Sequence, residues 1–187
     1  MLFLYYLWKG HNYRASLCHG LMTIFFHALN SQLQNALIAR IALLNSLIYF
    51  VTDLAGGEKG VEVWIHHIVA AAACTGAAMW DDEVGLWVQR GCGVLEFTNP
   101  CWTFFRLRIS KSSEILLPEV YSKRAAGIIF SFFFLPVRLI YFPLAFWKSP
   151  ESLPREFFFA IWIPLMLLNL YWSGLLFRGI IRELKST

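Results

Sequence analysis

The chain contains 187 residues, of which 58% are hydrophobic and only 15% are charged, and its formal net charge is +4. Soluble domains are about 45–50% apolar and about 25% charged, and a small domain buries only about two-thirds of the surface that its unfolded chain exposes. The composition therefore argues against a soluble globular domain and indicates an integral membrane protein. The positive charge does not indicate binding to nucleic acid, because the Lys and Arg residues are dispersed between apolar stretches.

Six segments approach the length and apolar character of transmembrane helices, which need about 17–25 predominantly apolar residues. In chain order they are residues 15–31, 34–54, 61–80, 84–105, 125–146 and 157–177. We therefore predict an all-α, polytopic membrane protein whose single domain, residues 15–181, is a bundle of about six transmembrane helices. Residues 1–14 are expected to be an interfacial segment or a truncated helix, and residues 182–187 a cytoplasmic tail.

Two of the predicted spans are more polar than the others. The first contains His19, His27 and Asn30, and the fourth contains Arg90 and Glu96. Because such residues are costly in contact with lipid, we expect both spans to face protein more than lipid.

The basic residues between the spans predict the orientation of the chain. With six spans, nearly all of them fall on one side of the membrane, and only Lys148 and Arg155 fall on the other. Cytoplasmic loops carry an excess of Lys and Arg. The sequence therefore predicts that both termini are cytoplasmic.

His66 and His67 stand side by side in the third predicted span, and Asp53 closes the second. Titratable residues inside a span are costly, which makes them candidates for function. In a catalytic interpretation, His66 or His67 is a general base or nucleophile and Asp53 orients it. In the alternative interpretation, these residues form interhelical hydrogen bonds that stabilise the bundle. Successive residues on a helix point about 100° apart, so one histidine is expected to face the interior and the other a helix interface.

Four further polar residues are predicted to line a lipid cavity or a buried polar network, namely His19, Glu96, Arg138 and Asn169. Helix rise places His19 in the cytoplasmic third of the membrane and the other three near the midplane. Glu96 and Arg138 are expected to form an ion pair, because opposite charges at one depth relieve each other's desolvation. If they do not touch, Glu96 becomes a candidate acid.

No metal or other cofactor is predicted. The four cysteines have no CxxC spacing. Adjacent histidines do not present ligands to one ion in the way that the HExxH spacing does. His19, one of the paired histidines and Asp53 could converge on a metal, but no spacing in the sequence favours this arrangement.

From about residue 14 onward, a set of residues follows one another in a fixed order across the predicted spans. They are Arg14, Ser16 and His19; Tyr49-Phe50 with Asp53; Trp64 with His66-His67; Leu95-Glu96 with Thr98 and Pro100; and Asn169-Leu-Tyr-Trp172 with Arg178. In the order and spacing of these residues the chain resembles the TLC family of membrane proteins. The resemblance implies a multi-helix membrane domain, often in the endoplasmic reticulum, that acts on or senses lipids.

The chain departs from the ceramide synthases, the best-known enzymes of that family. Their signature resembles His-Asp-x-x-Asp-x-x-Leu-Glu, and alignment of its end on Leu95-Glu96 places Val88, Gln89 and Cys92 at its polar positions. The chain is therefore more similar to TLC-domain proteins without ceramide synthase activity.

Two functions follow from the resemblance. The first is a protein that binds membrane lipids in its bundle and takes part in lipid homeostasis or trafficking, in the endoplasmic reticulum or at the plasma membrane. The alternative is a lipid acyltransferase that uses acyl-CoA as co-substrate and His66 or His67 as general base. A small transporter is not favoured, since the sequence shows neither internal repeats nor rings of like charge.

Overall fold

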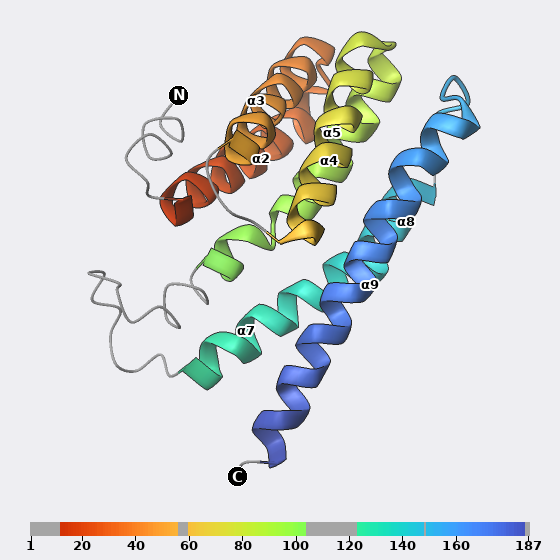
Figure 1. The fold of residues 1–187 in the computed structure, drawn as a ribbon. Helices are drawn as coiled ribbons and strands as arrows, with labels where there is room; N and C mark the ends of the chain where they lie inside the picture. Colours follow the sequence, from red (N-terminus) through yellow and green to blue (C-terminus); the bar gives the residue numbers. More distant parts are fainter. Residues whose placement is uncertain (1–11, 56–59, 104–122, 148, 186–187) are drawn as a thin grey trace.

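The computed structural model describes residues 12–55, 60–103, 123–147 and 149–185, and every secondary-structure element within them is helical (Figure 1). The elements are α2 (Asn12–Leu33), α3 (Ala36–Ala55), α4 (Val61–Met79), α5 (Asp82–Glu96), α7 (Lys123–Pro136), the π-helix η1 (Val137–Tyr141), α8 (Phe142–Trp147) and α9 (Arg155–Lys185). The predicted all-α fold is confirmed for these residues. The predicted N-terminal segment lies outside them, except for residues 12–14, which begin α2.

Helices α2 to α5 pack side by side, and α9 runs along them (Figure 1). Helix α3 contacts α2, α4 and α5, while α9 packs on α4, and η1 and α8 pack on α5. The C-terminal half of α9 continues past the α2–α5 group in Figure 1. This helix extends to Lys185, so residues 182–185, expected to be a tail, form its last turn.

Four helical stretches are long and apolar enough to cross a membrane: Ala36–Ala55, Val61–Met79, Gly127–Leu144 and Arg155–Arg182. They coincide with the second, third, fifth and sixth predicted spans. The fifth is interrupted by η1, which follows Pro136. These four stretches fit an integral membrane protein in contact with lipid.

The first and fourth predicted spans differ from the other four. Helix α2 is 22 residues long but is not among the strongly apolar stretches. Helix α5 has only 15 residues and is about 22 Å long, which is short of the roughly 20 residues that a span needs. It ends at Glu96 because Pro100 has no amide hydrogen to donate to the carbonyl of Glu96. Instead, the Thr98 hydroxyl caps the Leu95 carbonyl at 2.9 Å, and a short helical stretch follows at 99–103.

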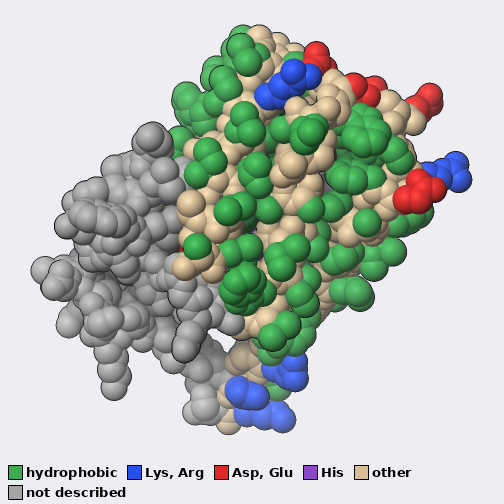
Figure 2. Space-filling view, turned by 45° about the horizontal axis from the view of Figure 1, so that its top comes forward, with side chains coloured by type: hydrophobic (Ala, Val, Ile, Leu, Met, Phe, Trp, Pro, Cys, Tyr) green, Lys and Arg blue, Asp and Glu red, His purple; other side chains and the backbone are tan. Residues whose placement is uncertain are grey.

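Helix α3 has its polar residues inside and its apolar residues outside. Large apolar side chains at a helical spacing form an exposed stripe, made up of Leu37, Ile41, Leu44, Ile48 and Val51. The opposite face is buried and includes Ser46, Tyr49 and Asp53. A soluble helix shows the reverse pattern. On the face in Figure 2, green apolar side chains cover the region between charged groups at the two ends of the molecule.

Close contact between α2 and α5 depends on Gly93. A Cβ atom at this position would overlap the ring of His27 on α2. Gly93 belongs to a Gly-x-Gly sequence that also contains Gly91, and small residues of this kind let membrane helices approach closely.

We therefore predict that Gly93→Ala lowers the free energy of unfolding by about 1–3 kcal/mol, because the extra methyl group overpacks the α2–α5 contact. Gly174→Ala is the matched control, since a Cβ at Gly174 meets no atom within 4 Å. It should be neutral or stabilising by up to about 1 kcal/mol through helix propensity. Unfolding in detergent measures both, and equal stability of the two variants would contradict the prediction.

Candidate functional site

His19 and Glu96 form the centre of a buried polar network. His19 on α2 is fully buried, and its Nδ1 lies 3.5 Å from Oε2 of Glu96 at the end of α5. Its Nε2 lies 3.2 Å from Oγ of Ser46 and 3.3 Å from Oγ1 of Thr23. The Nδ2 of Asn99 donates to the same oxygen of Glu96. One carboxylate therefore connects α2 with the end of α5 and the turn after it.

Tyr49 lies between this centre and a second histidine–carboxylate pair. Its ring stacks on His19 at 4.0 Å between centroids and lies 6.1 Å from the ring of His67. Nδ1 of His67 on α4 lies 3.3 Å from Oδ2 of Asp53 on α3. Both of these residues are buried. A carboxylate beside an imidazole nitrogen fixes the tautomer and orientation of the ring, as a general base requires.

The paired histidines both lie near the ring of Phe50 but point toward different helices, as the helical spacing predicts. His67 contacts Asp53, whereas the ring of His66 meets Trp172 on α9 edge-on at 5.4 Å and Phe50 on α3 at 5.9 Å. Of the candidate catalytic residues, His67 and Asp53 are therefore brought together. His66 instead faces the contact between α4 and α9.

Arg138 forms a third group of contacts, between η1, α9 and the end of α5. It lies in η1, and its Nη1 donates to Oδ1 of Asn169 on α9 at 3.2 Å. Its Nη2 donates to the Leu95 carbonyl and to Oγ1 of Thr98, each at 3.2 Å. The guanidinium is buried and also lies over the ring of Phe134. Short π-helical turns such as η1 occur frequently at functional sites.

The predicted ion pair between Glu96 and Arg138 is not among the contacts of the described residues. Arg138 instead binds the carbonyl of Leu95, the neighbour of Glu96, and Glu96 turns toward His19 on α2. The sequence placed His19 and Glu96 at different depths, but the two residues lie at one level, because Glu96 is at the end of α5 and not in its middle. Helix α5 runs back along α4 from Met79, and its 15 residues carry Glu96 to the level of the paired histidines.

Several buried polar atoms around Arg138 have no hydrogen-bond partner among the described residues. They are Nδ1 of His66, Nε of Arg138, Nδ2 of Asn169 and Oγ of Ser173. Asn169 and Ser173 are four residues apart and share one face of α9, and the charge of Arg138 reaches His66. A buried donor without a partner costs about 1–3 kcal/mol. These four atoms, which we call the unmatched polar cluster, therefore suit a ligand that carries oxygen atoms.

The sequence did not single out Ser173, Ser46, Thr23 or Asn99 as members of the site. Ser173 follows Asn169 by one helical turn, and this spacing was the available signal. Ser46 and Thr23 could not be recognised in this way, because their role depends on how α2 and α3 pack.

Within the described ranges, no three His, Cys, Asp or Glu side chains converge on a point where a metal could bind. The combination of His19, one of the paired histidines and Asp53, which the sequence left open, is not such a group.

Comparisons of the chain with models of protein families, with curated proteins and with solved structures gave no match. The resemblance to the TLC family therefore rests on the sequence features alone.

We predict that Arg138 and Asn169 are energetically coupled. Asn169→Leu should destabilise the protein by about 1–3 kcal/mol, because it leaves one more guanidinium donor unpaired in the interior. In the double variant Arg138→Met/Asn169→Leu, the loss should be smaller than the sum of the two single losses by about 1 kcal/mol or more.

A double-mutant cycle of unfolding free energies in detergent measures this coupling. The control pairs Arg138→Met with Leu170→Ala, since Leu170 is the exposed neighbour of Asn169 and should be additive. Additivity in both cycles would contradict the predicted bond.

Proposed function

We propose that this chain is a multi-pass membrane protein of the TLC type that binds the polar group of a lipid inside its helix bundle and takes part in membrane lipid homeostasis or trafficking. The unmatched polar cluster is the observation that carries this proposal. It presents buried hydrogen-bond donors of Arg138, Asn169 and Ser173 that have no partner among the described residues.

The chemistry of the cluster favours an acceptor-rich ligand. Arg138 Nε, Asn169 Nδ2 and the Ser173 hydroxyl can all donate, and the ester, phosphate or carboxylate oxygens of a lipid can accept. A hydrogen bond from a charged donor contributes about 1.5–3 kcal/mol. The acyl chains of such a ligand would lie along the apolar side chains that the helices expose.

The proposal includes a six-span arrangement with both termini in the cytoplasm and a location in the endoplasmic reticulum, which the family resemblance suggests. Helices α2 and α5 are the less apolar elements, and both pack against α3. Helix α5 reaches the length of a span only together with the short helical stretch at 99–103. Arg178, Arg182 and Lys185 follow one another along the C-terminal end of α9. This agrees with the excess of basic residues on one predicted side.

A ceramide synthase activity is not part of the proposal. The positions aligned with the acidic signature of those enzymes are occupied by Gln89 and Cys92. The Oε1 of Gln89 accepts a hydrogen bond from Nδ2 of Asn30 at 3.2 Å, and both side chains are buried. A neutral amide pair between α2 and α5 thus stands where those enzymes carry an acid.

We predict that Ser173→Ala lowers the amount of lipid that co-purifies with the protein by about twofold to tenfold, which corresponds to the loss of one hydrogen bond. Ser131→Ala is the matched control. Ser131 is a buried serine too, but its hydroxyl already donates to the Gly127 carbonyl at 2.7 Å. Quantitative lipid mass spectrometry on purified protein measures both, and equal lipid content in the two variants would contradict the proposal.

The contact of His67 with Asp53 favours a second candidate function, acyl transfer from acyl-CoA to a lipid amine or hydroxyl. In that reaction His67 removes the proton of the nucleophile as it attacks the thioester carbonyl. The tetrahedral intermediate then collapses, the C–S bond breaks, and the CoA thiolate leaves and takes up a proton.

For this candidate, purified protein incubated with labelled acyl-CoA and a mixture of lipid acceptors should form a labelled acyl lipid. His67→Ala should reduce the rate by about a hundredfold or more, whereas His66→Ala should retain most of it, since His66 lacks the carboxylate partner. The absence of product from the unaltered protein, with lipid binding retained, would exclude acyl transfer and leave the lipid-binding proposal standing.

A further inference from the structure

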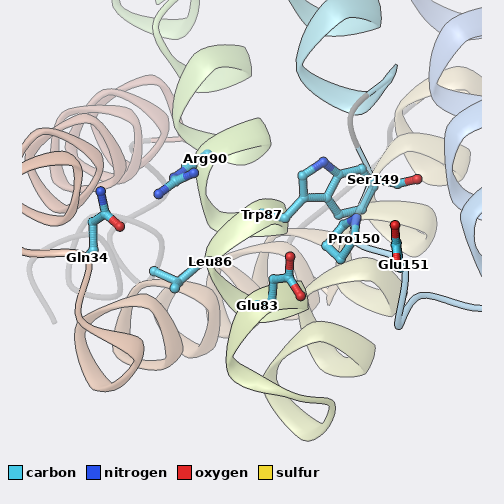
Figure 3. Close-up of a pocket in the computed structure, with 8 residues that line it drawn as sticks. All are labelled: Gln34, Glu83, Leu86, Trp87, Arg90, Ser149, Pro150 and Glu151. Atoms are coloured by element: carbon cyan, nitrogen blue, oxygen red, sulfur yellow. The ribbon is translucent and has the colours of Figure 1, made fainter.

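A groove lies at the end of the molecule remote from the paired histidines. It has a volume of about 490 Å³, within the usual range for small-ligand sites, and three segments line it. They are the turn between α2 and α3, one face of α5, and the connection between α8 and α9 (Figure 3). Its lining includes the side chains of Gln34, Glu83, Trp87, Arg90, Ser149 and Glu151.

This groove lies at the level where candidate membrane spans begin and end. Helix α3 begins at Ala36, α4 ends at Met79 and α9 begins at Arg155, each within a few residues of the lining segments. In a bilayer, the ends of such helices lie among the lipid headgroups. A ligand of this groove is therefore expected to be a headgroup and not an acyl chain.

One face of α5 presents both signs of charge at different depths. Glu83, Trp87 and Arg90 follow the i, i+4, i+7 spacing of a single helix face. Glu83 lies in the first turn, and Arg90 lies about 10 Å further along the helix toward the membrane interior. In Figure 3, Trp87 stands between Arg90 on one side and the segment Ser149–Glu151 on the other.

The charges of this groove are available to a ligand. Glu83, Arg90 and Glu151 form no ion pair with any of the described residues, and Arg90 and Glu83 are exposed. By contrast, Arg40 and Asp82, at the same end of the molecule, bind each other at 2.8 Å.

The start of α5 is fixed next to the α8–α9 connection. Asp81 accepts a hydrogen bond from the Val84 amide at 2.8 Å and one from the Ser152 side chain, and these bonds lower the pKa of Asp81. They hold Glu151 on the same side as the first turn of α5.

We infer that this groove binds the phosphate–ammonium headgroup of a zwitterionic phospholipid, with Arg90 on the phosphate and Glu83, Glu151 and Trp87 around the ammonium. An arginine fork matches phosphate oxygens, and a cation is attracted both by carboxylates and by the face of a tryptophan ring. In such a lipid the ammonium lies beyond the phosphate, farther from the acyl chains. This order matches that of Glu83 and Arg90 along α5. A purely anionic headgroup could bind Arg90, but it carries no ammonium group for Glu83 and Glu151, so the two carboxylates would repel it.

The inference is independent of the lipid site at Ser173, because the groove shares no residue with the unmatched polar cluster. The groove variants are therefore made in a Ser173→Ala background. If the groove binds no headgroup, Ser173→Ala by itself still lowers the lipid content. If the unmatched polar cluster binds no lipid, the groove variants still lower phosphatidylcholine binding.

The test uses the purified full chain in detergent, with dioleoylphosphatidylcholine and dioleoylphosphatidylglycerol added in equal amounts, and counts bound lipids by native mass spectrometry. We expect several-fold more phosphatidylcholine than phosphatidylglycerol to bind. Arg90→Gln and the double variant Glu83→Gln/Glu151→Gln should each reduce phosphatidylcholine binding about tenfold. The controls Arg40→Gln and Asp82→Asn each remove one charge at the same end of the molecule and should stay within about twofold, because neither residue lines the groove.

Three results would overturn the inference. One is equal binding of the two lipids, and another is phosphatidylcholine binding that survives both groove variants. The third is binding of free phosphocholine as tight as that of the lipid, since this would assign the groove to a soluble ligand.

Discussion

Polar groups that are withdrawn from an apolar exterior must find their partners inside the helix bundle, and this requirement governs the arrangement of the whole structure. Helix α3 shows it most clearly, with Leu37 to Val51 outside and Ser46, Tyr49 and Asp53 inside. In hydrocarbon an unpaired polar group costs several kcal/mol. The contacts of His19 with Glu96, His67 with Asp53, and Arg138 with Asn169 are the structural answer to that cost.

The short helix α5 brings the contact of His19 with Glu96 and the contacts of Arg138 together at its C-terminal end. Helix α5 ends at Glu96, and the carboxylate of Glu96 contacts His19. The end of the helix also leaves the Leu95 carbonyl and the Thr98 hydroxyl accessible to Arg138. A continuous span across residues 84–105 would have satisfied that carbonyl within the helix. The same break leaves Arg138 with an Nε atom that no described residue uses, and this atom belongs to the unmatched polar cluster on which the lipid proposal rests.

Sequence patterns were sufficient for much of the fold. Continuous apolar length predicted the helices at Ala36–Ala55, Val61–Met79 and Arg155–Arg182, because hydropathy reports directly what a bilayer selects. The different contacts of His66 and His67 followed from the 100° spacing alone. The sequence did not reveal the end of α5 or the partners of Glu96 and Arg138. These depend on the proline at position 100 and on the approach of α2 at Gly93, and neither changes the hydropathy.

Binding of lipid at the unmatched polar cluster is tested most directly by an experimental structure of the protein in a lipid nanodisc, at a resolution that shows ordered lipid. We expect lipid oxygen atoms within hydrogen-bonding distance of at least two of Arg138 Nε, Asn169 Nδ2 and Ser173 Oγ. A structure in which protein side chains alone occupy this space, or in which only water reaches these atoms while lipid stays on the outer surface, would contradict it.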